Sequence, residues 1–341
     1  MAQVVYSEVL KKVILGRSLT REEAHRAFEQ IMDGAWTEAQ IGGFLVALAA
    51  KGETPEEIAG GALAMREHVI PVSTEGAEVL DTCGTGGTGI STFNISTAVA
   101  MVLAGAGVRI AKHGNRTSTR ASGSANVLEA LGVNLDAGPD VQAACLREAG
   151  VCFCFAVKHH PAMRFAVPVR KQLAVRTVFN LLGPLTNPAG ARRQMMGVFD
   201  ASLTETLAEV LGMLGAIRAM VVHADDGLDE ISITSETKVS EFRAGKVETY
   251  RIRPGDFGLP SARLEDLLVN SAEQSAQVIR DVLDEKQGPA RDIVLLNAAG
   301  ALVVADRADD LAGGMELASE SIGSGAARGA LQKLVEMSNA G

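Results

Sequence analysis

The feature that most constrains the fold is a change of pattern near residue 78. Before it the chain carries only helix signals, and after it short β-like runs alternate with helical stretches. Strands separated by helices form βαβ units, in which the strands are parallel. We therefore expect a large α/β domain over residues 71–341, with a mostly parallel sheet flanked by helices. The predicted strands are Val79–Cys83, Val108–Lys112, Val151–Ala156, Met195–Phe199 and Ala219–His223.

Residues 1–70 predict a small all-helical domain. Thr20 precedes Glu23 by three residues and Thr37 precedes Gln40 by three, which is the capping-box spacing. Thr54 is followed by a proline at the first helical position, another typical helix start. Apolar residues behind each cap keep helical spacing. A helix from the 165–190 region is a candidate addition to this domain.

The second half of the chain adds two further expectations. Residues 231–252 are rich in Ser, Thr and Val and predict antiparallel strands at an edge of the sheet. The last 80 residues return to helical patterns, and Ser202 with Glu205 predicts a capped helix before the fifth strand.

Net charge and composition exclude several classes of protein. The formal net charge is −9, and no basic tail or basic and aromatic stripe is present, so we expect no nucleic-acid partner. The one basic cluster, Arg109–Arg120, is interrupted by Gly, Ser and Thr and suits a small anionic ligand better than a polymer. The longest apolar run, Ile293–Ala305, is too short to cross a bilayer, so no membrane partner is expected.

The four cysteines indicate the compartment. Cys83, Cys145, Cys152 and Cys154 contain no Cys-x-x-Cys pair, and the last two alternate with phenylalanines as core residues of a strand do. A chain of 341 residues without a cysteine framework fits a reducing compartment. Since the first ten residues lack a signal-peptide core, we expect a cytoplasmic protein.

A glycine-rich loop, Gly84–Gly89, follows the first predicted strand and precedes a helix. Glycine lets a backbone approach a phosphate closely, and successive N–H groups form an anion nest. The hydroxyl-rich stretch Ser91–Thr97 adds a helix N-terminus, a natural phosphate anchor. Alone, the loop fits a tight strand–helix turn without a ligand equally well, and it matches neither a Walker A motif nor a dinucleotide fingerprint.

A second polar loop, Lys112–Ser124, follows the second predicted strand. Its lysine, arginines and hydroxyls suit a diphosphate, with a point charge from Lys and fork-shaped donors from Arg. By itself it is also typical of a solvated loop. Because ligands bind beyond the carboxyl ends of parallel strands, two such loops on consecutive βα units favour one shared phosphate site.

Two later segments carry further candidates. Asp229 and Glu230 follow the fifth strand, where adjacent carboxylates suit a hard cation, whereas the preceding Asp-Asp-Gly is strong turn chemistry. His159 and His160, if in a strand, would point to opposite faces, so joint chelation is not expected. Arg170 could bind a substrate carboxylate or form a surface salt bridge.

Taken together, these segments resemble the anthranilate phosphoribosyltransferases. The resemblance follows the family's order along nearly the whole chain. The matching stretches are Cys83–Gly89, Thr92–Thr97, Lys112–Arg116, Ser122–Ala125, His160–Met163, Arg176–Pro188 and Asp226–Glu230.

The resemblance implies a fold, a reaction and partners. The fold is a small helical domain plus a large α/β domain, in a homodimer formed through the helical domain. The reaction joins anthranilate to phosphoribosyl pyrophosphate and yields phosphoribosylanthranilate and pyrophosphate, with Mg²⁺ as cofactor and no cysteine or serine nucleophile.

The resemblance also implies roles for residues of this chain. Anthranilate would contact Gly84, Asn115, Arg170, His113 and His160, and Mg²⁺ would be served by Ser96, Asp229 and Glu230. Phosphoribosyl pyrophosphate would be surrounded by Gly84, Gly87, Thr88, Thr92, Asn94, Ile95, Ser96, Thr97, Lys112, His113, Gly114, Asn115, Arg116, Thr117, Ser118, Thr119, Arg120 and Ser124.

The chain departs from the family pattern at a few positions. Thr88 stands where the family usually has Asp, and Ala121 stands where it commonly has Lys. Val157 and Asn126 replace a usual Pro and Asp. We expect Arg120 to supply the charge of the missing lysine.

Three other functions fit parts of the sequence. The first is a related transferase that acts on another aromatic acid or amine. The second is a phosphorolytic enzyme acting on pyrimidine nucleosides. The third is a non-catalytic relative that binds nucleic acid, which the acidity of the chain and the intact Asp229–Glu230 pair disfavour.

Overall fold

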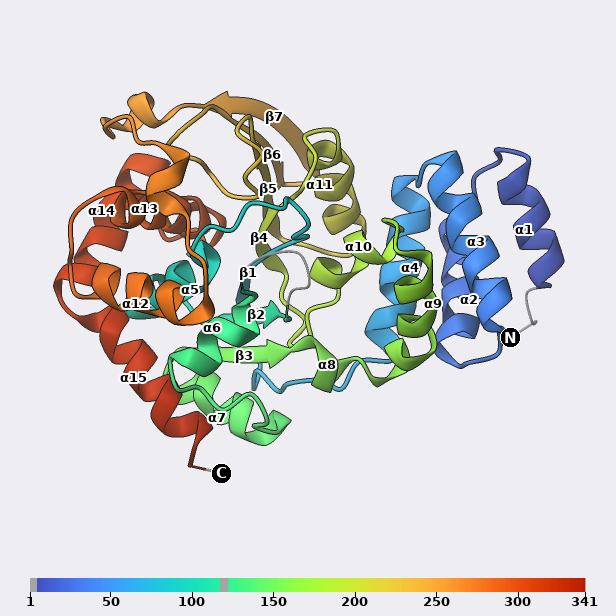
Figure 1. Ribbon diagram of the computed structural model, residues 1–341, viewed down its shortest axis with the longest axis horizontal. Helices are drawn as coiled ribbons and strands as arrows, with labels where there is room; N and C mark the ends of the chain where they lie inside the picture. The colour runs from blue at the N-terminus through green and yellow to red at the C-terminus, as the bar shows by residue number, and fades with distance from the viewer. Residues whose placement is uncertain (1–4, 117–121, 341) are drawn as a thin grey trace.

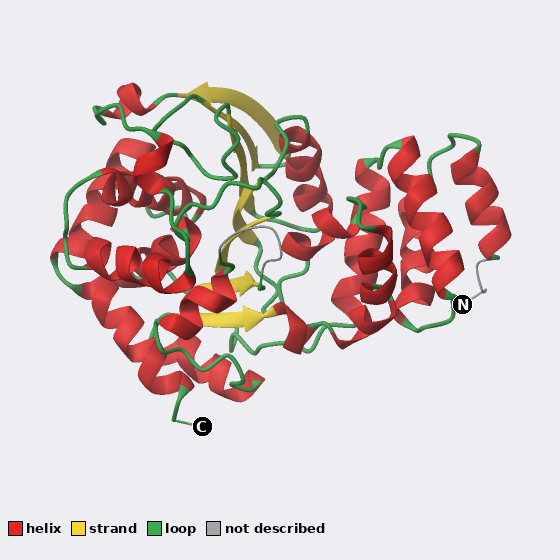
Figure 2. Ribbon diagram, in the orientation of Figure 1, coloured by secondary structure: helices red, strands yellow, loops and turns green. Residues whose placement is uncertain are grey.

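The structure is a computed structural model and describes residues 5–116 and 122–340. A helical bundle lies beside a larger α/β body whose strands run between layers of helices (Figures 1 and 2). The fold class predicted from the sequence is confirmed: an N-terminal bundle and a mostly parallel sheet flanked by helices.

The bundle contains α1 (Tyr6–Ile14), α2 (Arg21–Met32), α3 (Glu38–Lys51) and α4 (Pro55–Glu67). The three predicted helix starts are confirmed, because Thr20, Thr37 and Thr54 each form a reciprocal capping box with the residue three positions later. Helices α2 and α4 pack so closely that a Cβ atom at Gly60 would lie 2.4 Å from the carbonyl oxygen of Arg21. A glycine is therefore required at this crossing.

The sheet has seven strands in the order β3-β2-β1-β4-β5-β6-β7. The first five run parallel, and β6 and β7 add an antiparallel edge, as residues 231–252 predict. The predicted strands all form, with bounds shifted by a residue or two. The strands are β1 (Leu80–Gly84), β2 (Ile110–Gly114), β3 (Val151–Phe155), β4 (Arg193–Gly197), β5 (Arg218–Ala224), β6 (Thr237–Arg243) and β7 (Lys246–Ile252).

Alternate residues of the strands face two separate hydrophobic cores. Met195 packs into the core shared with the C-terminal helices, whereas its neighbour Met196 packs into the core shared with α11 and the bundle. This follows from the two-residue period of a strand. The helices around the sheet are α5 (Ile95–Gly105), α6 (Ser124–Ala130), α7 (Pro139–Glu148), α11 (Leu203–Met213), α12 (Ala272–Leu283), α13 (Pro289–Val304), α14 (Leu311–Gly323) and α15 (Ala326–Ser338), with short 3₁₀ turns at Pro254–Phe257 and Leu264–Leu267.

The segment between β3 and β4 returns to the bundle. Helix α9 packs against α3, and α10 packs against α4. This excursion places Val167–Leu182 at the boundary between the bundle and the sheet (Figure 1). Its elements are α8 (Ala156–His159), α9 (Val167–Leu173) and α10 (Phe179–Leu182), with 3₁₀ turns at Pro161–Phe165 and Gly183–Leu185.

One local prediction was wrong. Ser202 precedes α11, but its hydroxyl donates to Asp200 Oδ1 at 2.7 Å and caps no helical N–H. His159 ends helix α8. Within the described parts of the chain, none of the helices combines the length and apolar composition that a membrane crossing requires.

Candidate active site

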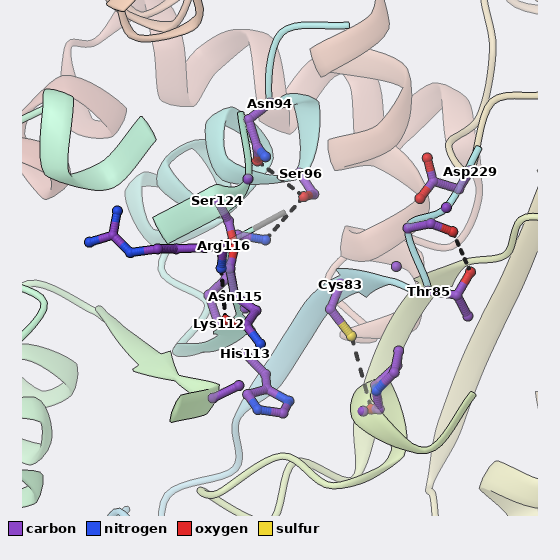
Figure 3. A pocket seen from close by; sticks show the side chains of 18 of the residues that line it. Cys83, Thr85, Asn94, Ser96, Lys112, His113, Asn115, Arg116, Ser124 and Asp229 are labelled. Atoms are coloured by element: carbon purple, nitrogen blue, oxygen red, sulfur yellow. Dashed lines mark hydrogen bonds between the residues drawn. The ribbon is translucent and has the colours of Figure 1, made fainter. Parts of the chain in front are cut away.

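The carboxyl ends of β1, β2, β3 and β5 converge on one cavity of about 380 Å³. Parallel strands end at the same edge of a sheet, so the loops that follow them meet there. The cavity brings together most of the residues predicted from the sequence (Figure 3). These are Gly84, Gly87, Thr92, Asn94, Ile95, Ser96, Lys112, His113, Gly114, Asn115, Arg116, Ser124, Arg170, Asp229 and Glu230.

The glycine loop leaves β1 and turns over the end of β4. The Thr85 N–H donates to Gly197 O at 2.9 Å, and the Thr85 hydroxyl accepts from the Phe199 N–H at 3.1 Å. Gly86 and Gly87 then take φ values of +63° and +81°, a conformation that residues with a Cβ rarely adopt. The sequence therefore needs glycine here to bring the backbone to the cavity.

Helix α5 points its N-terminus at the same cavity. Asn94 caps it, with its Oδ1 accepting from the Thr97 N–H at 3.1 Å. Asn94, Ile95 and Ser96 line the cavity, so the uncompensated backbone donors of the first turn lie beside it.

Lys112 is the main buried cation of the site. Its side chain is 2 % exposed, and Nζ donates to Thr82 O at 2.5 Å and to Ser96 Oγ at 3.0 Å. Burial lowers the pKa of Lys112, and the nearby charge of Asp81 opposes that shift. The lysine is thus held in place before any anion binds.

Asp81 supports this arrangement from beneath the loops. Its Oδ1 accepts from the His113 N–H at 3.0 Å and its Oδ2 from Asn187 Nδ2 at 2.8 Å. Burial raises the pKa of Asp81 against these two hydrogen bonds. Burial, together with the charge of Asp81, raises the pKa of the Cys83 thiol well above its usual value, so Cys83 does not present a thiolate to the cavity.

His113 and His160 form a buried pair next to the cavity. Their Nε2 atoms lie 3.2 Å apart, so one ring donates and the other accepts. Burial lowers the pKa of His160 to about 4, with a further contribution from His159. Burial, aided by His160, lowers the pKa of His113 well below 6.5. Both imidazoles are therefore neutral at pH 7.

The acidic loop after β5 divides into a turn and a cavity wall. Asp226 Oδ1 accepts from the Leu228 N–H at 3.1 Å, and Asp225 pairs with Arg251 at 2.9 Å, so both serve the turn. Asp229 and Glu230 line the cavity instead. Asp229 is 6 % exposed.

Two glycines make room for Asp229. A Cβ at Gly197 would lie 1.7 Å from the Asp229 carbonyl oxygen, and a Cβ at Gly84 would lie 2.8 Å from Asp229 Oδ2. The ends of β1 and β4 thus form a cradle in which the carboxylate sits. In Figure 3, Asp229 lies on the side of the cavity away from Asn94, Ser96 and Lys112.

Arg170 reaches the cavity from α9. Its guanidinium lies over the Phe179 ring, 5.6 Å from the centroid, and burial lowers its pKa. Among the described residues no carboxylate pairs with it. Arg170 therefore does not form the surface salt bridge that was the alternative role open to it from the sequence.

Some predicted residues lie elsewhere. Thr88 accepts from the Ile90 N–H through its hydroxyl, Thr97 is fully buried against Asn94, and His160 lies behind His113, so none of the three lines the cavity. Thr117, Ser118, Thr119 and Arg120, and with them Ala121, lie outside the described residues.

Sequence reasoning assigned no role to the remaining lining residues. All of them except Ala156 belong to the stretches that carry the family resemblance, but no role was predicted for them. They are Cys83, Thr85, Gly86, Phe93, Ser122, Gly123, Ala156, Phe179, Asn180, Gly183 and Pro184.

The fold and the site define a glycosyl transferase. Family models match both parts of the chain: "Glycosyl transferase family, helical bundle domain" over residues 7–69 and "Glycosyl transferase family, a/b domain" over residues 76–328.

Comparison with individual proteins shows which glycosyl transferases this chain is similar to in sequence and structure. The anthranilate phosphoribosyltransferase of Desulfosudis oleivorans is 50% identical over 333 residues, which cover 97% of this chain and 98% of that protein. The crystal structure of the Thermus thermophilus enzyme aligns with a TM-score of 0.92 at 43% identity, covering 97% of this chain and 99% of that one. The chain belongs to the anthranilate phosphoribosyltransferase family.

A third relative was solved with ligands. The Saccharomyces cerevisiae enzyme in complex with PRPP (phosphoribosyl pyrophosphate) and Mg aligns with a TM-score of 0.88 at 27% identity, covering 98% of this chain and 97% of that one. The same enzyme was also solved with 4-fluoroanthranilate. The yeast enzyme therefore binds PRPP, Mg and an anthranilate analogue.

Proposed function

We propose that this chain transfers the phosphoribosyl group of PRPP to anthranilate, giving N-(5-phosphoribosyl)anthranilate and pyrophosphate in tryptophan biosynthesis. The observation that carries the proposal is that one cavity holds two complementary sets of groups. The first set suits a diphosphate, and the second suits an aromatic carboxylate.

The diphosphate set combines three kinds of donor. The backbone of Gly84–Gly87, the N-terminus of α5 and the ammonium of Lys112 all face the cavity. Each favours an anion, and together they supply both neutral and charged donors in a site partly removed from water. Ser124 extends the set on the second loop, where Arg116 also lines the cavity while its guanidinium pairs with the Glu129 carboxylate.

The carboxylate set is led by Arg170. A guanidinium donates two parallel hydrogen bonds to a carboxylate, and Arg170 has no such partner within the described chain. Asn115 and the neutral His113 add polar contacts without adding charge. His160 serves through its hydrogen bond to His113.

The acidic pair fits a magnesium ion. Asp229 and Glu230 are oxygen donors of the type that Mg²⁺ prefers, and the glycine cradle fixes where Asp229 lies. The hydroxyl of Ser96, the third donor expected from the sequence, accepts from Lys112 Nζ on the other side of the cavity (Figure 3). When bound, Mg²⁺ would neutralise charge on the diphosphate leaving group. Two carboxylates alone are too few for a complete protein cage, so these residues suit an ion held largely by water and phosphate.

The chemistry requires positioning and charge stabilisation. The bond from ribose C1 to the diphosphate oxygen breaks, and the amino nitrogen of anthranilate bonds to C1 and releases a proton. Lys112, the loop amides and the α5 terminus oppose the negative charge that grows on the leaving group. An aromatic amine is already neutral at pH 7, so the site must place it rather than deprotonate it.

The activity is tested by mixing the pure protein with Mg²⁺, PRPP and anthranilate and following the loss of anthranilate fluorescence. We expect turnover by the wild type and its loss in the Asp229→Asn, Glu230→Gln double variant with folding retained. Asp225→Asn, in the same loop but paired with Arg251, is the matched control and should keep its activity. Binding of PRPP without turnover by the wild type would reject the proposed reaction.

The proposal also covers the oligomeric state of the protein and its place in the cell. We expect a homodimer through the helical bundle, where Ile14, Leu15 and Val46 expose apolar side chains. The four cysteines are free thiols, which fits a reducing cytoplasm. Light scattering of the wild type and of Val46→Glu would test the dimer, because only the wild type should have twice the monomer mass.

A further inference from the structure

Arg176 touches the glycine loop from outside the cavity. It lies between α9 and α10, and its Nη2 donates to the Gly87 carbonyl oxygen at 2.6 Å. Its guanidinium also lies over the Phe199 ring, 4.0 Å from the centroid. Because Arg176 does not line the cavity, this contact acts on the loop and not on a ligand inside the site.

The two ends of the glycine loop are anchored to the backbone of other segments. Thr85 pairs with Gly197 at the first end, and Ser91 O accepts from the Val269 N–H at 2.9 Å at the second. The middle has no regular structure and contains three glycines with positive φ. Glycine has the largest backbone freedom of any residue, and inside the loop the Thr88 hydroxyl accepts from the Ile90 N–H at 3.3 Å. A contact from another segment therefore adds to a turn that the loop forms by itself.

Arg176 supplies a contact of this kind and also joins the loop to the bundle. The helices on either side of it pack on α3 and α4. The arginine is therefore carried by a segment that belongs to the bundle side of the molecule, while the carbonyl that it holds belongs to the sheet side.

We propose that Arg176 is a positioning residue that holds the glycine loop in the shape that receives the diphosphate of PRPP. This inference rests on the proposed function and extends it to a residue outside the site. A peptide unit is planar, so holding the Gly87 carbonyl fixes the orientation of the following N–H as well. If the loop is already ordered before PRPP binds, its ordering does not have to be offset by the binding free energy of PRPP, and the affinity is higher.

The kinetic test compares Arg176→Met with the wild type. We expect KM for PRPP to rise about fivefold, a small loss for a charge-assisted hydrogen bond because Arg176 is exposed to solvent. Because the loop amides also oppose the charge that grows on the leaving group, kcat should fall as well, whereas KM for anthranilate should stay unchanged. Arg176→Lys keeps a charged donor but loses the planar stacking, so its KM should lie between the two.

Arg164→Met is the matched control. Arg164 also lies over a phenylalanine, with its guanidinium 4.4 Å from the Phe165 ring, and also donates to a backbone carbonyl, that of Pro161. It does not contact the glycine loop. Its loss should leave KM for PRPP within about twofold of the wild type.

Hydrogen–deuterium exchange distinguishes a role of Arg176 in positioning the glycine loop from direct ligand binding and from a general structural role. In the ligand-free protein, Arg176→Met should speed exchange in the peptide covering residues 84–91 and leave β5 unchanged. A higher KM with unchanged loop exchange would mean that Arg176 contacts the ligand directly, and would overturn the proposal. Faster exchange throughout the sheet would assign it a general structural role and overturn it too. If the wild type failed to bind PRPP, the proposed function would fail, while loop exchange would still test the positioning.

Discussion

The buried histidine pair predicts a specific loss of stability in acid. Burial lowers the pKa of His160 from 6.5 to about 4 in the folded chain. Between these two values the unfolded chain binds a proton that the folded chain does not, so the free energy of unfolding falls as pH falls. This contribution is fully present above pH 6.5 and is lost by about pH 4. The difference of about 2.5 pKa units corresponds to about 3 kcal/mol, of which about 2 kcal/mol is lost by pH 5.

The assay is urea unfolding of the wild type and of His160→Gln at pH 7.5 and pH 5.0. Glutamine can still bond to His113 but does not titrate, so the variant should lose about 2 kcal/mol less than the wild type between the two pH values. Equal pH dependence in both proteins would refute the reasoning.

His68 provides a control of opposite sign. Against the effect of burial, its hydrogen bonds to Ala64 O and Asp33 raise the pKa of His68. Its contribution is therefore present below pH 6.5 and is lost as pH rises through the raised value. His68→Gln should destabilise the protein more at pH 5.0 than at pH 7.5.

Two further substitutions test the walls of the cavity. Arg170→Met should raise KM for anthranilate roughly 30-fold and leave the affinity for PRPP unchanged in calorimetry, because a charge-assisted bond to the carboxylate is lost; equal losses for both substrates would place Arg170 elsewhere in the mechanism. Gly197→Ala should abolish Mg²⁺-dependent turnover or lower the melting temperature sharply, since its Cβ would lie 1.7 Å from the Asp229 carbonyl oxygen. Gly255→Ala, with no atom within 4 Å of the added Cβ, should behave as the wild type.

The predictable parts of the fold were those set by local chemistry. The capping boxes of Thr20, Thr37 and Thr54 form as the three-residue spacing requires, because both partners lie in one helical turn. Ser202 has the same spacing to Glu205, yet its hydroxyl bonds to Asp200. A competing acceptor two residues earlier was enough to change the outcome.

The site residues that directly follow a strand could be predicted from the sequence. Those on the segment that leaves the sheet for the bundle and comes back were harder to predict. Lys112 and Asp229 come from loops after β2 and β5, and parallel topology alone brings those loops to one edge. Phe179 and Asn180 line the cavity because the segment after β3 goes out to the bundle and comes back. No local pattern encodes that path. The contact between Arg176 and Gly87 depends on the same excursion.

Thr88 stands in the glycine loop at a position where the sequence resemblance leads us to expect Asp. Its hydroxyl accepts from the Ile90 N–H at 3.3 Å, two residues on, which is the bond that an aspartate carboxylate makes in an Asx turn. Threonine can therefore keep the turn that an aspartate at this position would form. What the substitution removes is a negative charge beside a loop proposed to hold a diphosphate. The loop retains its glycines and its contact with Arg176, so the exchange alters the electrostatics of the phosphate site more than its shape.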